Sequence, residues 1–344
     1  MTIKQNGIYM LEDIFEIIIP TFNRSPYLKN TLESLLDEKS PVKNVNITIL
    51  DNASFDGTGL IAREFAEKHS NVKHIINERN TGGDVNICKA YGMAKKEYAW
   101  VLCDDDSYSW EAWPEVVKMM SEKIPVIYAG PVYGNEEPGY DFYINEMSFV
   151  PYIIFRSEII TDDLLTSMYK STYTLMQQMR IPVKCANENL AIGHLSRPII
   201  YPGQKNMPEN HRARNIMRRG IKNRSDITAV MEKQPFLLPG KILVLQDVQD
   251  PQIREKAMRI AMKDYPGDMI LEFIRYFASK TELLNIAAAM FMCLSPEQQR
   301  RLHKIRKMIF GLYMVEAEDK KILFVNFLGR YRRRIWTFRN KSSK

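Results

Sequence analysis

Residues 98–107 read YAWVLCDDDS, an apolar run followed by three consecutive aspartates. The run shows no polar alternation, which is typical of a strand covered on both faces in a parallel sheet. Ligands of such sheets bind beyond the carboxyl ends of the strands. Three adjacent carboxylates repel one another unless a cation is near, and oxygen ligands of this kind suit Mg²⁺ or Mn²⁺ shared with phosphates. On this stretch alone, a solvated acidic turn remains the alternative.

Three similar units precede this stretch. Each has a short apolar segment, a turn rich in polar residues and an amphipathic segment of helical period. The apolar segments are 15–19, 45–50 and 72–76, and the turns read PTFNRS (20–25), DNASFDGT (51–58) and ERNTGGD (78–84). Repeated strand–helix alternation predicts a doubly wound α/β fold. The chain has neither G-x-G-x-x-G after its first strand nor G-x-x-x-x-G-K-[ST], which argues against a dinucleotide enzyme and a P-loop protein.

The length of 344 residues predicts one large or two ordinary domains. The four cysteines are far apart without metal-ligand spacing, so we expect reduced thiols in a cytosolic protein. We see no signal peptide and no apolar run long enough to cross a bilayer. The net charge of +7 is uneven, because residues 300–344 hold 14 Lys+Arg against 3 Asp+Glu. Such asymmetry indicates a basic tail that meets an anionic surface.

Beyond the aspartates the pattern predicts a helix at 113–120, strands at 126–129 and 149–155, a long loop at 130–145 and a helix at 169–179. From residue 226 onward we expect helices at 252–263, 268–279, 281–294, 296–313 and 318–337. The last of these mixes arginines with aromatic residues, which suits an anionic membrane surface. The alternatives are a helix that binds a partner or dimerises, and a solvated basic tail.

Four motifs together resemble the nucleotide-sugar half of a family 2 glycosyltransferase with the GT-A fold. They are IIIPTFNR (17–24), ILDNASFDGT (49–58), NERNTGGDVN (77–86) and VLCDDDS (101–107), in the expected order and each at the end of a predicted strand. The resemblance covers about the first third of the chain and fades after residue 150. It implies a Rossmann-like, mainly parallel sheet with helices on both faces. We therefore expect a GT-A domain at 1–225, with its nucleotide-sugar half at about 14–107 and its acceptor half at about 108–225, followed by a helical domain with the basic tail at 226–344.

The resemblance implies an inverting, metal-dependent transfer of a hexose or N-acetylhexosamine from a nucleoside-diphosphate sugar, with a UDP-sugar as first choice. The acceptor would be a saccharide or lipid-linked saccharide in a bacterial surface polysaccharide, lipooligosaccharide or glycoprotein glycan. We expect the protein in the cytoplasm, or peripheral on the inner face of the cell membrane, and we expect no nucleic-acid partner. Alternatives are a nucleotidyltransferase, which would carry a Gly-rich basic loop after the first strand, and a non-catalytic nucleotide-binding scaffold.

The motifs assign site residues by resemblance. Asp51 would accept a hydrogen bond from the base, although an Asx-turn is the plain alternative. Asp106 would be the direct ligand of Mn²⁺ or Mg²⁺, together with Asp104, and the metal would neutralise the departing diphosphate. The expected nucleotide-sugar site consists of Pro20, Thr21, Asn23, Arg24, Asp51, Asn52, Asn80, Gly82, Gly83, Asn86, Asp104 and Asp105.

The catalytic base is less well marked. Many family members carry a Glu-Asp pair at the start of the helix expected at 169–179, but residues 167–170 read SMYK here. The nearest carboxylates are Asp162 and Asp163 upstream, of which we prefer Asp163, and Glu188 downstream, each with a helix cap or solvated turn as its alternative. The polar, basic segment 201–225 would form a lid whose His211, Arg212 and Arg214 reach the diphosphate. A surface loop is the alternative.

Overall fold

The computed structural model describes residues 2–4, 7–132, 137–203, 237–263, 310–317, 320–327 and 331–339. The chain divides into two compact units, Met1–Ile270 and Leu271–Lys344. Each unit is described by itself. The domain boundary expected after residue 225 lies outside the described residues, as do the helices expected at 268–279 and 281–294.

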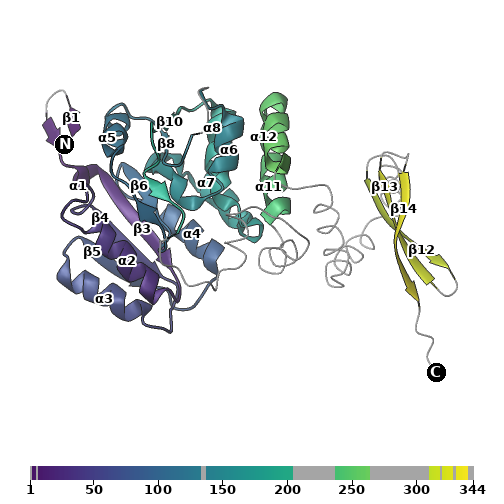
Figure 1. Ribbon diagram of the computed structural model, residues 1–344, viewed down its shortest axis with the longest axis horizontal. Coiled ribbons are helices and arrows are strands. Elements are labelled where there is room, and N and C mark those ends of the chain that lie inside the picture. Colours follow the sequence, from purple (N-terminus) through teal and green to yellow (C-terminus); the bar gives the residue numbers. More distant parts are fainter. Residues whose placement is uncertain are drawn as a thin grey trace. The chain divides into compact units, whose positions relative to one another are not determined.

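A seven-stranded sheet in the order β10-β8-β9-β6-β3-β4-β5 forms the centre of the first unit (Figure 1). Its strands are β3 (Phe15–Thr21), β4 (Asn46–Asp51), β5 (Val72–Ile76), β6 (Tyr98–Val101), β8 (Val126–Tyr128), β9 (Ile153–Arg156) and β10 (Ile192–His194). Every pairing is parallel except those of β9 with β6 and β8. The predicted mainly parallel α/β sheet is confirmed.

The strand order determines on which face of the sheet each connecting helix lies. They are α2 (Ser25–Leu35), α3 (Thr58–Lys68) and α4 (Gly83–Gly92), after the short α1 (Leu11–Ile14). The chain steps from β3 to β4 to β5 on one side and then returns to β6 on the other side of β3. Right-handed crossovers therefore place α2 and α3 on one face and α4 on the opposite face, as Figure 1 shows.

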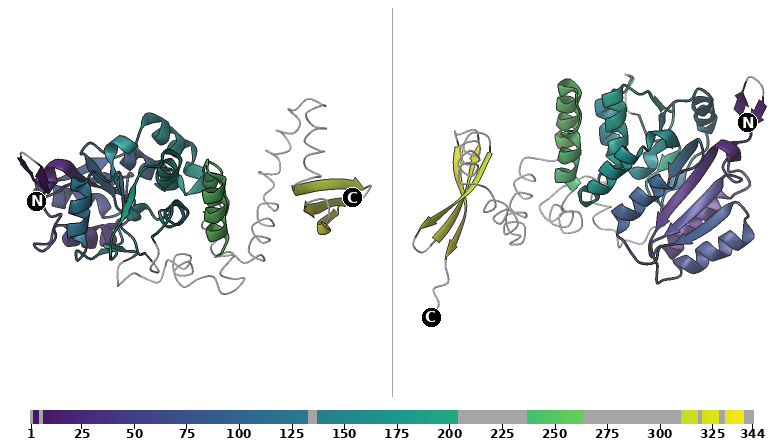
Figure 2. Two further views of the ribbon diagram at one scale, coloured as in Figure 1. Left: turned by 90° about the horizontal axis from the view of Figure 1, so that it is seen from above. Right: turned by 180° about the vertical axis from the view of Figure 1, so that it is seen from behind.

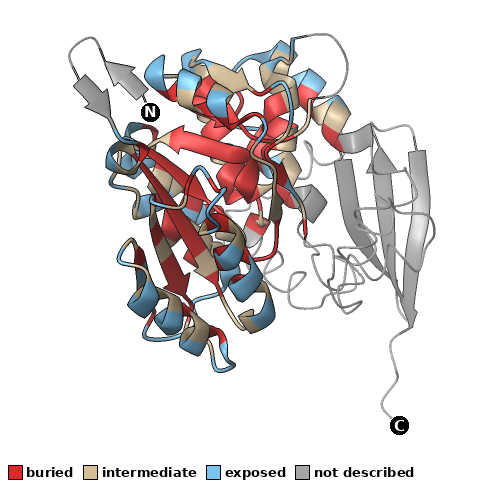
Figure 3. Ribbon diagram, turned by 60° about the vertical axis from the view of Figure 1, so that its left-hand side comes forward, coloured by how far each residue is buried: buried red, intermediate tan, exposed pale blue. Residues whose placement is uncertain are grey.

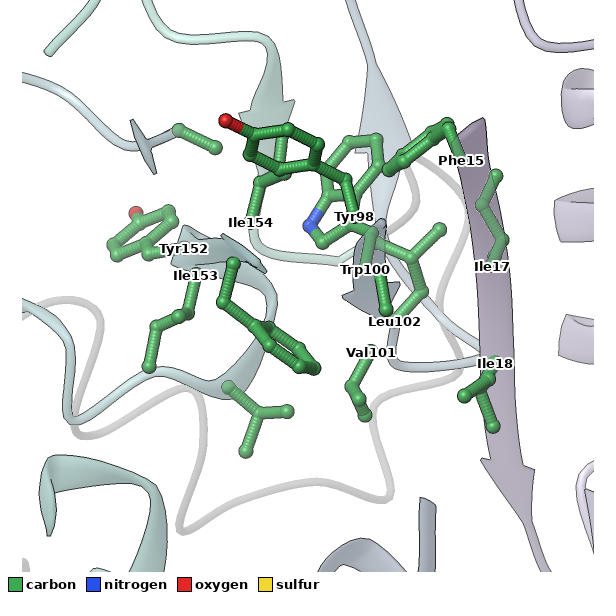
Figure 4. Packing of buried hydrophobic residues seen from close by; sticks show 14 of the residues in the cluster. Phe15, Ile17, Ile18, Tyr98, Trp100, Val101, Leu102, Tyr152, Ile153 and Ile154 are labelled. Carbon is green, nitrogen blue, oxygen red and sulfur yellow. The ribbon is translucent and has the colours of Figure 1, made fainter. Parts of the chain in front are cut away.

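The core is built on β3 and β6, whose side chains are almost all buried (Figure 3). Figure 4 shows Trp100 of β6 among Phe15, Ile17 and Ile154. Trp100 is fully buried, and its indole N–H donates to the carbonyl of Pro151 at 2.7 Å. The absence of polar alternation in these strands is explained by helices on both faces.

The second half of the unit differs locally from the expectation. Its helices are α5 (Trp113–Ser121), α6 (Tyr140–Glu146), α7 (Asp162–Lys170) and α8 (Arg180–Glu188). The expected long loop at 130–145 is wrong from Tyr140 onward, where α6 begins. The helix expected at 169–179 is also wrong, because two short 3₁₀ turns, Thr172–Thr174 and Gln177–Met179, separate α7 from α8. Thr161 starts α7 early by accepting a hydrogen bond from the backbone of Leu164 at 3.3 Å.

Two helices near the end of the first unit complete a second apolar cluster. They are α11 (Leu237–Leu245) and α12 (Pro251–Lys263), the latter in agreement with the helix expected at 252–263. Figures 1 and 2 show α12 beside α6. Ile144 of α6 and Ala257 of α12 are both fully buried in this cluster. The Asn145 side chain also donates to the carbonyl of Ala257 at 3.0 Å, which fixes the two helices together.

The described part of the second unit is a three-stranded antiparallel sheet, not a helix. Its strands are β12 (Phe310–Ala317), β13 (Lys320–Phe327) and β14 (Tyr331–Arg339). The helix expected at 318–337 is therefore wrong, as is the end of the one expected at 296–313. The physical reason is composition, because sequences such as ILFVNF (322–327) are β-branched and aromatic. Among the described residues, no helix is long and apolar enough to span a membrane.

Candidate functional site

The carboxyl ends of β3, β4 and β6 and the start of α4 enclose a cavity of about 200 Å³. These segments are far apart in the sequence but adjacent in the sheet order, so their terminal turns meet at one edge. Eight residues of the expected nucleotide-sugar site line the cavity: Pro20, Thr21, Arg24, Asn52, Gly83, Asn86, Asp104 and Asp105. Phe22, Ile87, Cys103 and Val150 complete its lining.

The first two aspartates of the triplet are tied to the end of β3. Thr21 donates its hydroxyl to Oδ2 of Asp104 at 2.6 Å, and Nε of Arg24 lies 3.2 Å from Oδ1 of the same residue. Nη2 of Arg24 reaches Oδ2 of Asp105 at 2.7 Å. The side chains of Asp104 and Asp105 are 6% and 0% exposed. The guanidinium therefore neutralises two buried carboxylates that would otherwise repel each other.

The turn after β3 holds Arg24 in place. Asn23 adopts a left-handed conformation with φ 53°, which asparagine tolerates. Its N–H donates to Oγ of Ser54 at 2.9 Å, and its side-chain oxygen accepts from the N–H of Phe55 at 3.0 Å. The N–H of Arg24 donates to Oγ1 of Thr58 at 2.7 Å. Asn23, which is absent from the cavity lining, thus joins the turns after β3 and β4.

Asp51 lies at the end of β4 and is 1% exposed. Its Oδ1 accepts from the N–H of Ser54 at 2.9 Å, and its Oδ2 lies 3.4 Å from Nε2 of His74 on β5. Burial by itself raises the pKa of Asp51, but the hydrogen bonds with His74 and Ser54 and the charge of His74 outweigh it, so the pKa is lowered. The bond from Ser54 matches the Asx-turn alternative, and Asp51 is not among the residues that line the cavity.

A buried amide network fixes the start of α4 against the sheet. Asn77 donates to the side-chain oxygens of Asn52 and Asn86, each at 2.9 Å. Asn52 donates in turn to Oδ1 of Asn80 at 2.8 Å, which also accepts from the N–H of Gly82. Gly82, at φ 90°, makes the turn that a side chain would strain. Of the expected site residues, Asn80 and Gly82 therefore act as turn residues outside the cavity lining.

The third aspartate lies beside a possible cation position. Cys103, Asp105 and Asp106 each offer a ligand atom, and these atoms lie within 4.8 Å of one another. Oδ1 of Asp106 also accepts a hydrogen bond from the N–H of Gly203 at 2.8 Å. Asp104, expected to share the metal with Asp106, points its two oxygens at Thr21 and Arg24. The two carboxylates of this group fit Mg²⁺ or Mn²⁺, whereas the thiol of Cys103 is a softer ligand than these cations prefer.

The two expected base residues lie elsewhere. Asp163 and Glu188 line a different cavity of about 470 Å³ beside α7 and α8, and none of its described lining residues belongs to the first cavity. Glu188 is paired with Lys184 at 2.5 Å and is half exposed. The proposed lid residues His211, Arg212 and Arg214 lie outside the described residues.

One carboxylate beside the first cavity carried no role in the sequence reading. Asp84 follows the cavity-lining Gly83 in the first turn of α4, and its Oδ1 accepts from Nε2 of Gln177 at 3.1 Å. Burial raises the pKa of Asp84, although the hydrogen bond with Gln177 opposes the change. The only local sign of Asp84 in the sequence is its position directly after the Gly82-Gly83 pair. No local pattern in the sequence indicates that Gln177, far along the chain, contacts it.

Comparison with known proteins finds similarity to glycosyltransferases. The model of glycosyl transferase family 2 matches residues 16–181. An uncharacterised glycosyltransferase of Mycoplasma pneumoniae is 31% identical over 104 residues, 30% of this chain and 35% of that protein. The abequosyltransferase RfbV of Salmonella typhimurium is 30% identical over 27% of this chain and 28% of its own length. The minor teichoic acid biosynthesis protein GgaB of Bacillus subtilis is 26% identical over 33% of this chain and 14% of its own length.

The chain thus spans less than half the length of these relatives. Among solved structures, residues 1–349 of S. aureus TarS in complex with UDP-GlcNAc align with a TM-score of 0.50 and 15% identity. That alignment covers 86% of this chain and 80% of the other, and it supports the GT-A fold. Residues 16–181 therefore form a glycosyl transferase family 2 domain.

Proposed function

We propose that the protein is a metal-dependent glycosyltransferase that moves one sugar from a nucleoside-diphosphate donor to a saccharide acceptor. The observation that carries the proposal is the convergence of four strand-end motifs on one cavity edged by the aspartate triplet. Relatives named for abequose transfer and teichoic acid biosynthesis support an acceptor in a bacterial surface glycan. A UDP-sugar is the first donor to test.

Different residues of the site would bind the nucleoside, the metal and the diphosphate. The polar turns after β3 and β4 would receive the nucleoside, with Asp51 held rigid by His74 and Ser54. Asp105 and Asp106 would hold a divalent metal, with the thiol of Cys103 at its edge. The metal would supply positive charge to the diphosphate as it leaves. Arg24, always cationic, lies at the same edge of the cavity and would add a charged donor for phosphate oxygens.

We assign the general base to Asp84 rather than to Asp163 or Glu188. Asp84 is not itself among the lining residues of the cavity, but it is the chain neighbour of the lining residue Gly83, and Gln177 donates to its carboxylate. A base with a raised pKa binds the proton of the acceptor hydroxyl more strongly, which favours transfer near neutral pH. The acceptor oxygen would attack the anomeric carbon while the bond to the diphosphate breaks and takes the electron pair. The acceptor proton passes to Asp84, and direct displacement inverts the anomeric centre.

The function is tested by incubating the full chain with a panel of UDP-, GDP-, TDP- and CMP-sugars, with Mn²⁺ or with EDTA. Metal-dependent release of the nucleotide from one donor, accelerated by saccharide acceptors, is the expected result. Metal-dependent binding without any release would instead favour the non-catalytic scaffold. A nucleotidyltransferase would release pyrophosphate from a nucleoside triphosphate and sugar phosphate.

We further propose that the basic end of the chain contacts an anionic membrane surface. Residues 300–344 carry 14 Lys+Arg against 3 Asp+Glu, and β14 contains Arg332, Arg333 and Arg334 in succession. Each basic residue near an anionic bilayer contributes about 1 kcal/mol of attraction. The proposal depends on this charge and not on a helix.

A further inference from the structure

Arg24 is a cation already present in the carboxylate cluster. Its guanidinium contacts Asp104 at 3.2 Å and Asp105 at 2.7 Å, and its side chain is 21% exposed. The guanidinium carbon lies 5.0 Å from the centre of the Tyr27 ring. The backbone of Arg24 is anchored to Thr58, so the long side chain extends from a fixed point.

Asp105 belongs to two groups at once. It pairs with Arg24 through Oδ2, and it is also a member of the Cys103–Asp105–Asp106 group that could hold a metal. A carboxylate engaged by a guanidinium has part of its charge neutralised, so it is a weaker ligand for a second cation. The guanidinium and a metal ion near the same carboxylate also repel each other.

We propose that Arg24 is a positioning residue that competes with the divalent metal for Asp105 and so holds the metal affinity of the empty site low. The inference rests on the proposed function. When a nucleoside diphosphate enters, its phosphate oxygens are alternative acceptors for the guanidinium. Arg24 then exchanges Asp105 for the diphosphate, and Asp105 becomes available to the metal. Metal and nucleotide therefore bind with positive coupling, and by linkage each increases the affinity of the other.

This role predicts a gain of metal affinity on loss of the side chain. Arg24→Gln removes the competing charge and leaves Asp104 and Asp105 without their guanidinium. We expect Mn²⁺ alone to bind about tenfold more tightly than to the wild type, a change of about 1.4 kcal/mol. The further increase caused by UDP should shrink. A merely structural role for Arg24 gives the opposite result, because a distorted site binds metal more weakly.

The experiment measures Mn²⁺ binding by electron paramagnetic resonance on the full chain, with and without UDP. Arg156→Gln is the matched control, because Arg156 is 19% exposed and pairs with two glutamates, Glu97 and Glu158, on another part of the sheet. It should leave the Mn²⁺ affinity unchanged. Arg24→Lys keeps the positive charge but loses the planar guanidinium, so its Mn²⁺ affinity should lie between those of wild type and Arg24→Gln. It serves as a second variant if Arg24→Gln fails to fold.

The outcomes separate the inference from the proposed function. Tighter Mn²⁺ binding by Arg24→Gln with reduced coupling to UDP supports it. Equal or weaker binding by both Arg24 variants, while the wild type binds Mn²⁺, overturns the competition and leaves the metal-dependent transferase standing. Failure of the wild type to bind Mn²⁺ even with nucleoside diphosphates overturns the proposed metal site itself, and the inference with it.

Discussion

The backbone N–H of Gly203 donates a 2.8 Å hydrogen bond to Oδ1 of Asp106. The contact lies just past the short pair of β7 (Ser107–Tyr108) and β11 (Ile200–Tyr201), in which Tyr201 is opposite Ser107. It joins the turn after β11 to the aspartate triplet. The orientation of Asp106 is therefore set by a residue that the local motif does not contain.

Gly203→Ala should weaken Mn²⁺ binding. Gly203 has φ 80°, and a side chain in this left-handed region costs about 1–2 kcal/mol, so the turn is expected to shift and move the N–H from Asp106. Isothermal titration with Mn²⁺ and a nucleoside diphosphate measures the effect. Gly57→Ala is the control, because Gly57 has φ −72° and accepts a methyl group without backbone strain. Equal affinity in both variants would show that the contact does not position Asp106.

Asp84→Asn should slow nucleotide release from the donor by about 10²–10⁴-fold, the usual contribution of a general base. Donor binding should be unchanged, because the amide oxygen can still accept from Gln177. The rate of nucleotide release by the wild type should rise with pH as Asp84 ionises. The variant should not show this rise. Asp163→Asn serves as control. A larger loss of rate in Asp163→Asn than in Asp84→Asn would indicate that the base is Asp163, in the second cavity.

The same variant has a stability signature. Folding raises the pKa of Asp84 above its ordinary value of 3.8, so ionisation opposes folding. Its contribution to stability is greatest below the unfolded value and is lost as the pH rises through the folded value. Asp84→Asn should therefore gain stability relative to wild type as the pH rises from 3.5 to 7 in urea titrations. A constant difference across this range would contradict the raised pKa.

Asn77→Ala should destabilise the fold by about 1–3 kcal/mol, because it removes the donor to the buried amide oxygen of Asn86, whereas that of Asn52 still accepts from Thr81. Lys89, which donates to Asn77 at 2.6 Å, loses its acceptor as well. Chemical denaturation measures the change. Asn44→Ala, on the exposed surface, should stay within about 0.5 kcal/mol of wild type. Similar values for the two variants would show that the network contributes little.

We expect the contribution of Asp51 to stability to depend on pH in the opposite direction from that of Asp84. The pKa of Asp51 is lowered in the folded protein, so its stabilising contribution is present above the ordinary value of 3.8 and is lost as the pH falls through the folded pKa. Asp51→Asn should therefore be less stable than wild type at pH 7, with a difference that shrinks in acid. Denaturation at pH 7 and pH 3 checks this. A difference that grows in acid would contradict the lowered pKa.

Replacing Arg332, Arg333 and Arg334 with glutamine should weaken binding to anionic vesicles by about 3 kcal/mol at low salt. Co-sedimentation with vesicles rich in phosphatidylglycerol measures it, with neutral phosphatidylcholine vesicles as the control. The far-ultraviolet spectrum should stay unchanged, because glutamine can occupy a strand. Equal co-sedimentation of wild type and variant would contradict the proposed membrane contact of these arginines.

Much of the first unit could be predicted because its signals are local. The strands at 15–19, 45–50, 72–76 and 98–102 are short segments rich in β-branched, aromatic and other apolar residues, and each ends in a turn of Asx, Ser, Pro or Gly residues. The order of these turns also carried the family resemblance. Parallel strands bring such turns to one edge, so most of the cavity lining followed from the strand assignment alone.

The remaining features depend on contacts between distant segments. The pairing of Arg24 with Asp105, of Gln177 with Asp84 and of Gly203 with Asp106 leaves no trace in local sequence. The resemblance to the family favoured Asp163 and Glu188 as the base, whereas the hydrogen bond that makes Asp84 a candidate comes from Gln177, far along the chain. At the end of the chain, arginines between aromatic residues fit a helix and a strand equally well, and β14 is a strand.

The central claim is that Asp106 belongs to a metal-dependent nucleotide site. The most direct test is the melting temperature of wild type and Asp106→Asn with UDP, GDP, TDP and CDP, each with Mn²⁺ or EDTA. A ligand that binds only the folded state raises the melting temperature. The account predicts a rise for wild type with one nucleotide, only in the presence of Mn²⁺, and its loss in Asp106→Asn. Failure of every nucleotide to raise the melting temperature of wild type, or an equal rise in Asp106→Asn, would contradict it.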